Sequence, residues 1–207
     1  KVGARLSVGA SYEQGDLSFA NEGELRDARS TGVLASAFLD RSRLDVNVYA
    51  GYRKLERKDG PASVLYDGPS GGAQVTYAAT RLISLGAFAR SSLVSSLFVQ
   101  NAFYDERRVG ATVGISPRVA SFFVSYEVGS NRYLTVISAI GADPIKRNDD
   151  VKTLRGRVTT RLGRLLNLGV DVSQSRYDSN YPGLDRSIFR VGTTIGFGST
   201  GSIDIIK

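Results

Sequence analysis

The sequence predicts an all-β fold, a single antiparallel sheet of about ten strands in up-and-down order. Apolar and polar residues alternate along successive runs, and the connections between runs are alternately short and long. Several runs are also about 11 or 12 residues long, roughly twice the usual strand length in soluble proteins. Side chains alternate between the two faces of a strand, and this period of two is not that of a helix. We therefore expect one domain over residues 1–207.

The run over residues 43–53 is the clearest strand. Leu44 and Val46 lie on one face, and Asp45 lies between them on the other. Apolar and charged side chains are thereby separated onto opposite faces, as in a strand with two different surroundings. The same alternation recurs in chain order over residues 2–13, 108–116, 120–128, 154–162, 166–173 and 189–197.

Two further runs are strands with an irregular polar face. Residues 29–39 carry Leu34 and Phe38 on the face that is expected to be polar, and residues 84–92 carry Phe88 there. Large apolar groups are therefore expected at a few positions of an otherwise polar face.

Connections between the runs alternate in length. The tight ones span residues 40–42, 81–82, 117–118 and 163–165, and the long polar ones span residues 14–28, 55–70, 129–151 and 178–185. Short turns at one rim and long loops at the other are typical of an up-and-down membrane barrel. The stretch 93–106 either extends its neighbouring strands or forms one more hairpin, so the prediction is ten strands, with twelve as the alternative.

Strand length and the polar face favour a barrel that crosses a membrane over a soluble barrel or sandwich. Eleven residues at roughly 3.3 Å each span about 36 Å, and a tilt near 40° reduces this to about 28 Å, close to the thickness of the hydrocarbon layer. A face that carries Arg, Asp and Glu is not a dry core, because each unpaired buried charge costs several kcal/mol. A closed barrel leaves no unpaired strand edge in lipid. We therefore expect the apolar face toward lipid and the polar face toward the lumen.

The composition excludes several chemistries. Cys and His are both absent, which removes disulfides, thiolate sites, the commonest metal ligand and the usual general base. No stretch approaches the roughly 18 consecutive apolar residues of a membrane-spanning helix. The net charge of +7 comes mainly from 21 Arg against 6 Lys, and Arg suits the capture of carboxylate or phosphate. We expect no enzyme activity, no metal and no cofactor.

Three strands with similar sequences each carry a tyrosine near the same end, on the apolar face. These residues are Tyr12, Tyr52 and Tyr126. Amphipathic rings favour the headgroup level of a membrane, so these residues are predicted to form part of an aromatic girdle. The alternative is that Tyr is simply a favoured strand residue.

The last hairpin carries a resemblance to a known family. It consists of RLLNLGVDVS over residues 164–173, a loop with the sequence YDSN, and FRVGTTIGF over residues 189–197. This hairpin, and with it nearly the whole chain, resembles Gram-negative outer-membrane β-barrels, in particular porin-like barrels encoded with exopolysaccharide systems. The resemblance implies a place in the cell outer membrane among lipid and lipopolysaccharide. It also implies anionic saccharides or other envelope proteins as partners, and no nucleic acid.

Barrels of this family commonly end in an aromatic residue. Phe197 fits that role, yet residues 198–207 follow it. Two interpretations stay open: residues 202–207 add a short strand to the sheet, or the chain is a segment of a larger barrel.

With the apolar face outward, nine Arg and three acidic residues are expected to line the lumen. They are Arg5, Arg43, Asp45, Arg53, Arg90, Arg108, Glu127, Arg155, Arg157, Arg161, Asp171 and Arg190. The densest cluster is Arg155, Arg157 and Arg161 on one strand. Rings of charged side chains set the selectivity of pores. The alternative is that paired Arg side chains fill the lumen, because a ten-stranded barrel is only slightly wider than the eight-stranded barrels that side chains fill.

These residues favour a narrow, Arg-lined pore for small anionic or saccharide solutes. Two alternatives stay open. The first is a non-transporting outer-membrane barrel whose long loops bind a partner or a polysaccharide. The second is a soluble basic all-β binding module, which predicts solubility without detergent and a salt-dependent affinity for nucleic acid.

Overall fold

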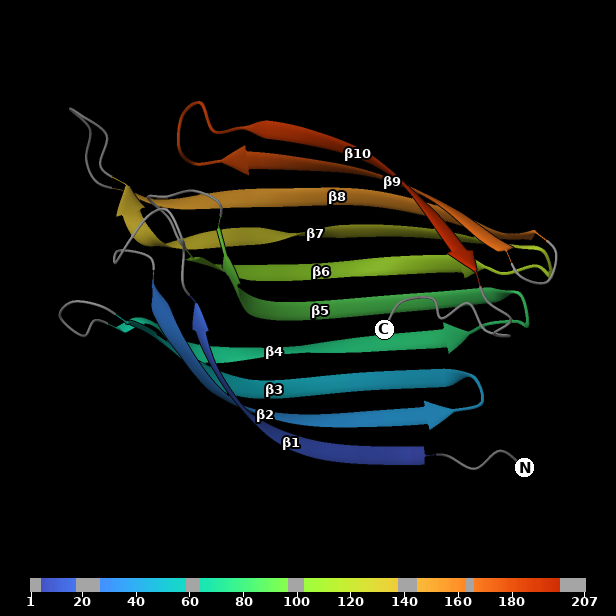
Figure 1. The fold of residues 1–207 in the computed structure, drawn as a ribbon, viewed down its shortest axis with the longest axis horizontal. Helices are drawn as coiled ribbons and strands as arrows, with labels where there is room; N and C mark the ends of the chain where they lie inside the picture. The colour runs from blue at the N-terminus through green and yellow to red at the C-terminus, as the bar shows by residue number, and fades with distance from the viewer. Residues whose placement is uncertain are drawn as a thin grey trace.

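The computed structural model describes residues 5–17, 27–58, 64–96, 103–137, 145–162 and 166–197. This part of the chain forms ten strands in one sheet (Figure 1). The strands are β1 (Arg5–Leu17), β2 (Ala28–Arg41), β3 (Leu44–Arg57), β4 (Val64–Ala78), β5 (Ile83–Ser95), β6 (Phe103–Ile115), β7 (Ala120–Ile137), β8 (Ile145–Leu162), β9 (Leu166–Ser179) and β10 (Arg186–Phe197). Among the described residues, no helix is long and apolar enough to cross a membrane.

Each strand pairs antiparallel with its neighbours in sequence, so the sheet runs from β1 to β10 without a crossover. The predicted all-β, up-and-down architecture is confirmed. The stretch 93–106 extends β5 and β6, which gives ten strands in the described part of the chain. The sheet is not closed there, since β1 and β10 lie at its opposite edges (Figure 1).

The strands are longer than the sequence pattern predicts. β7 and β8 have 18 residues each and take up most of the predicted loop 129–151. β3 and β4 likewise reach into the predicted loop 55–70. These two loop predictions are wrong because charged and amide residues interrupt the apolar alternation in these segments, while backbone pairing continues through them.

The registers bring the apolar residues of neighbouring strands onto one face. Leu39 lies opposite Leu6 on β1 and opposite Val46 on β3. This face, here called the outer face, is exposed, with Val8 at 77% and Ile195 at 64% of full exposure. Polar and charged side chains occupy the opposite face, here called the hollow face.

Two zones follow each other along the strands. The apolar band runs from the tight turns to the level of Tyr12, Tyr52 and Tyr126. The loop-side extension lies beyond that level, toward the left in Figure 1. Apart from glycines, every buried residue of the described chain lies in this extension: Ala28, Leu55, Ser96, Phe103, Asp105, Arg108, Asn131, Tyr133, Arg147, Asp149, Val151 and Thr153.

The hairpin of β5 and β6 separates from β4 at the loop side, while β6 stays paired with β7 as far as Tyr104. β4 pairs with β5 only from Gly71 onward, whereas β5 and β6 stay paired to their loop-side ends. Phe103 packs in one apolar cluster with Leu55, which lies on the hollow face of β3. Residues 92–95 and 103–106, here called the inturned hairpin, therefore lean across the hollow face toward β2 and β3.

Candidate functional site

A cavity of about 460 Å³ lies on the hollow face, over strands β3 to β8. Its lining combines aromatic rings, amide and hydroxyl groups, and three charged side chains. The residues are Tyr49, Gln74, Thr76, Ser84, Phe88, Ala89, Arg90, Thr112, Phe123, Ser125, Glu127 and Arg155. Sites for small molecules typically measure roughly 300–1,000 Å³ and combine apolar walls with a few polar groups. This cavity is therefore the candidate functional site.

Each aromatic ring of the cavity stands directly opposite a glycine on the neighbouring strand. The pairs are Tyr49 with Gly72, Phe88 with Gly110, and Phe123 with Gly114. A Cβ atom on Gly110 would lie 2.6 Å from the Phe88 ring, and one on Gly72 would lie 2.9 Å from the Tyr49 ring. Glycine at these two positions therefore leaves room for the rings along the wall, which keeps the lumen open.

Two arginines of the cavity have different surroundings. The Nε atom of Arg90 lies 3.3 Å from the carboxylate of Glu106, and its Nη2 atom lies 3.7 Å from that of Glu127. Its guanidinium is also 5.6 Å from the centre of the Phe88 ring. Arg155 is exposed and has no ion-pair partner within the described residues. Arg155 is therefore the cation that this cavity leaves open to an anionic ligand.

Other predicted lumen residues are held by partners. Arg53 donates to Glu13 over 2.7 Å, and Arg157 pairs with Asp171, directly opposite it on β9. Arg108 is buried, and it donates to two backbone carbonyl oxygens at 2.9 Å each. These three arginines stabilise the wall, as the alternative of paired side chains requires.

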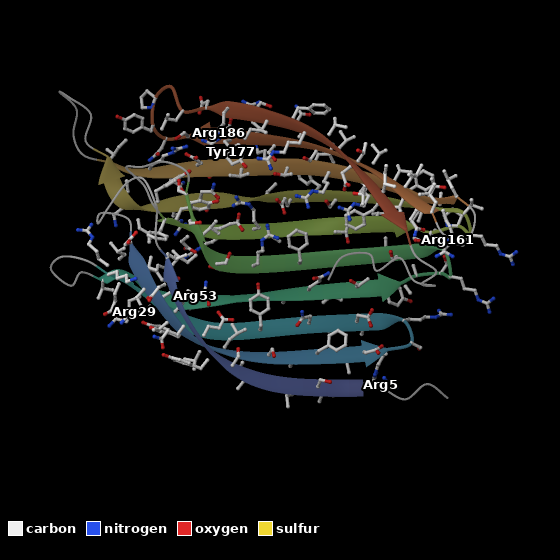
Figure 2. All side chains as sticks on the ribbon, viewed as in Figure 1. Arg5, Arg29, Arg53, Arg161, Tyr177 and Arg186 are labelled. Carbon is white, nitrogen blue, oxygen red and sulfur yellow. The ribbon has the colours of Figure 1, made fainter. Side chains whose placement is uncertain are left out.

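The remaining predicted residues lie away from the cavity. Asp45 stands at the turn-side end of β3, and Figure 2 shows Arg5 and Arg161 toward the same end of the sheet. Arg190 lies on β10, at the sheet edge. Arg43 lies in the tight turn between β2 and β3, at the rim rather than in the wall.

Tyr12, Tyr52 and Tyr126 lie on the outer face, and each is at least half exposed. Tyr12 and Tyr52 both stand opposite Val33, from its two sides, so they share one level of the sheet. The rings of these tyrosines thus lie at the loop-side border of the apolar band. The aromatic girdle stays a prediction that this placement supports.

A buried polar cluster in the loop-side extension was missed by the sequence analysis. Arg147 donates to both carboxylate oxygens of Asp149, over 2.8 and 2.6 Å, and both side chains are at most 1% exposed. The Arg147 guanidinium lies 4.5 Å from the centre of the Tyr133 ring, which is 5.2 Å from that of Tyr104. Burial beyond the apolar band raises the pKa of Tyr104 to about 12. The only sequence signal was an alternation of opposite charges inside the predicted loop 129–151.

The cluster continues across the neighbouring strands. The Arg186 guanidinium lies 4.3 Å from the centre of the Tyr177 ring, and Figure 2 shows the two side by side. Arg186 also reaches within 3.9 Å of the Asp149 carboxylate. Ion pairs and rings therefore join β7, β8, β9 and β10 at the loop side.

Comparison with known proteins supports the fold. No protein-family model and no curated protein matches the sequence. Among solved structures, the chain is similar to the FrpB iron transporter from Neisseria meningitidis (F3-3 variant), with a TM-score of 0.57 and 11% identity over 93% of this chain and 40% of that chain. The likeness shows the fold of an outer-membrane barrel wall, and the chain spans less than half the length of that transporter. The closer resemblance to barrels encoded with exopolysaccharide systems stays a prediction.

Proposed function

We propose that this chain forms part of the wall of an outer-membrane β-barrel, and that the hollow face of this wall carries a path for small anionic or saccharide solutes. The observation that carries the proposal is Arg155, an exposed cation on the cavity lining with no ion-pair partner within the described residues. Its planar guanidinium suits bidentate contact with a carboxylate or phosphate. Four other predicted lumen arginines, Arg53, Arg90, Arg108 and Arg157, are already paired, so Arg155 is the cation of the cavity that is left for a solute.

The rest of the cavity lining supports a saccharide as the solute. Tyr49, Phe88 and Phe123 supply flat apolar surfaces, and Gln74 and Ser125 are among the groups that supply donors and acceptors. A sugar ring has both kinds of surface, apolar C–H faces and a rim of hydroxyl groups. An acidic saccharide would add the charge that Arg155 complements.

The outer face supports a place in the outer membrane. Val8, Val124 and Ile195 are among many large apolar side chains exposed there. A soluble protein rarely exposes a continuous apolar surface of more than a few hundred Å². The soluble basic module is therefore disfavoured.

The open sheet supports the interpretation that these strands are a segment of a larger barrel. The ten described strands leave β1 and β10 at separate edges of the sheet. The part of the FrpB iron transporter that matches these strands is 40% of its chain. Further strands would close the wall, because a strand edge is not stable in lipid. A barrel of more strands also has a wider lumen, which leaves space for a solute beside paired arginines.

Conductance measurements in planar bilayers test the proposal. The full-length protein that contains these strands is folded in detergent, its fold is checked by heat-dependent migration in gels, and its ion selectivity is measured in a salt gradient. We expect a pore that prefers anions, and a lower preference in Arg155→Gln. Arg118→Gln is the matched control, since Arg118 is an exposed residue between β6 and β7, outside the cavity. A folded full-length barrel without conductance, or an Arg155→Gln variant with unchanged selectivity, would refute the proposal.

One observation favours the second candidate, a barrel that binds a partner through its loops. The inturned hairpin packs against β2 and β3, which narrows the hollow at the loop side. A deletion of residues 129–151 would cut β7 and β8, so the test replaces only residues 138–144 with a Gly-Ser linker. Loss of acidic polysaccharide binding together with an absent conductance would favour this candidate, and unchanged binding would exclude it.

A further inference from the structure

A second cavity lies on the other side of the sheet, where β4 and β5 separate. It measures about 400 Å³ and opens on the outer face. Gly71, Ala73 and Ala89 form its floor together with Val109 and Val128. By register all five belong to the outer face, and Val109 and Val128 lie one outer-face position beyond the level of Tyr126. We call this cavity the fork groove.

The fork groove results from the inward lean of the inturned hairpin. β4 and β5 are paired up to Gly71 and Ser91, and beyond this pair they diverge. The floor residues on β4 and β5 have no side chain larger than a methyl group, so little side-chain volume fills the space where the two strands separate. The result is a hollow with an apolar floor that faces the same surroundings as the exposed valines and leucines of the outer face.

A cation stands at the upper rim of the groove. The Nε atom of Arg107 donates to Asp105 over 2.9 Å, and Asp105 also accepts from Ser91 over 3.1 Å. Asp105 is nearly buried, whereas the Arg107 side chain is 54% exposed. Within the described residues, this network holds Arg107 by one nitrogen, and the other N–H groups of its guanidinium have no hydrogen-bond partner.

Arg107 stands opposite Ser130 of β7, which stands opposite Asp150 of β8. Two further cations lie one outer-face position closer to the apolar band: Lys152 stands opposite Val128, and Arg176 stands opposite Lys152 on β9. Lys54 holds the corresponding place on β3, one position beyond Tyr52 on the same face. Lys54 pairs with Glu56 over 2.6 Å and Arg176 pairs with Asp178 over 2.8 Å, so Lys152 is the cation of these three that has no ion-pair partner within the described residues. A lipid phosphate lies at this depth when its acyl chains lie along the band.

We propose that the fork groove binds a phosphate-bearing membrane lipid, with an acyl chain along the floor of Gly71, Ala73 and Ala89 and the phosphate on Arg107. Lys152 lies two strands away from Arg107 and adds to the positive potential around the headgroup. The site is on the face opposite to the proposed solute path. Its presence or absence is therefore independent of conductance.

The test measures lipid retention by native mass spectrometry of the folded chain in a neutral detergent. The probes are dioleoyl phosphatidylglycerol, dioleoyl phosphatidylcholine with the same chains and no net charge, and glycerol 3-phosphate, which has the phosphate and no chains. We expect the folded chain to retain phosphatidylglycerol in preference to the other two. Arg107→Gln should lower this retention by about fivefold, as expected for the loss of one cation near an anionic lipid headgroup.

Two further variants test the floor of the groove and serve as a charge control. Ala89→Leu leaves every charge in place but fills the floor, so it should lower the retention of both dioleoyl lipids. Arg118→Gln removes an exposed cation at the opposite, turn-side rim and should change nothing. Equal retention of the two lipids, binding of glycerol 3-phosphate as strong as that of phosphatidylglycerol, or unchanged retention in Arg107→Gln would each overturn the proposal.

Discussion

In the apolar band, side chains such as Val8 and Ile195 are more than 60% exposed, whereas in the loop-side extension of the same strands Leu55 and Asp149 are 0% exposed. The band is a single layer of sheet whose outer face meets its surroundings directly. The extension has a second layer over part of its hollow face, because the inturned hairpin packs against β2 and β3.

This difference indicates which contacts stabilise each zone. In the extension, apolar groups and ion pairs are removed from water by the chain itself. In the band, every described side chain other than glycine keeps part of its surface exposed, so the chain itself does not cover the outer face. A substitution should therefore act strongly in the extension and weakly on the outer face of the band.

The largest effect is expected from Asp149→Asn. This change leaves the Arg147 guanidinium buried without its bidentate carboxylate, and breaking a buried pair in this way costs about 3–5 kcal/mol of unfolding free energy. Urea unfolding in detergent micelles measures it. The control is Asp178→Asn, which breaks the exposed pair with Arg176 and should cost about 0–1 kcal/mol. Equal losses for the two variants would contradict the burial of the Arg147 pair.

Leu55→Ala should be the next most destabilising change. Leu55 lies in the apolar cluster under the inturned hairpin, and removing such a side chain typically costs about 2–5 kcal/mol. The same unfolding assay is applied to Val124→Ala, where the side chain is 51% exposed on the outer face. A cost for Val124→Ala as large as that for Leu55→Ala would mean that the two zones do not differ as described.

Gly110→Ala tests the packing of the Phe88 ring against the hollow face of the sheet. The added Cβ would lie 2.6 Å from the Phe88 ring and 2.7 Å from the backbone oxygen of Tyr126. Such overpacking typically costs about 1–3 kcal/mol. Gly156→Ala is the matched control, since a Cβ there meets nothing within 4 Å, and it should be neutral or stabilise by up to about 1 kcal/mol. If both variants unfold alike, the ring does not lie over Gly110.

The smallest effect concerns alkaline pH. Burial raises the pKa of Tyr104 to about 12 in the folded chain, whereas an unfolded Tyr titrates near 10. The contribution of this group is therefore complete below pH of about 10 and declines as the pH rises toward about 12, because only the unfolded chain loses the proton there. Unfolding free energies measured across this range should fall less steeply in Tyr104→Phe. Identical slopes would show that Tyr104 is not buried.

Much of the band was predictable from the sequence, because its two faces meet different surroundings. The alternation around Val46, the tight turns and the place of Phe88 on the hollow face all follow from a period of two. Leu34 and Phe38 also lie on that face, opposite Gly51 and Asn47 of β3. Residues 129–151 of the loop-side extension were predicted as loop, since charged residues such as Arg147, Asp149 and Asp150 interrupt the apolar alternation there.

The candidate site was predictable only in part. Arg90, Glu127 and Arg155 were expected on the lumen side and do line the cavity. The cluster expected on β8 is divided, since Arg157 is paired with Asp171 and Arg155 is not paired within the described residues. A pattern of faces shows that a residue points inward, and it does not show which residue stands opposite.

The strands of the apolar band, their order and their apolar face follow from the sequence alone, because they depend on local alternation and turn chemistry. The full length of the strands, the glycine that stands opposite each ring, the carboxylate beside each arginine and the point where β5 separates from β4 are evident only in the folded structure. These features depend on cross-strand register and on the direction in which a hairpin leans, and both are set by contacts between residues far apart in the chain.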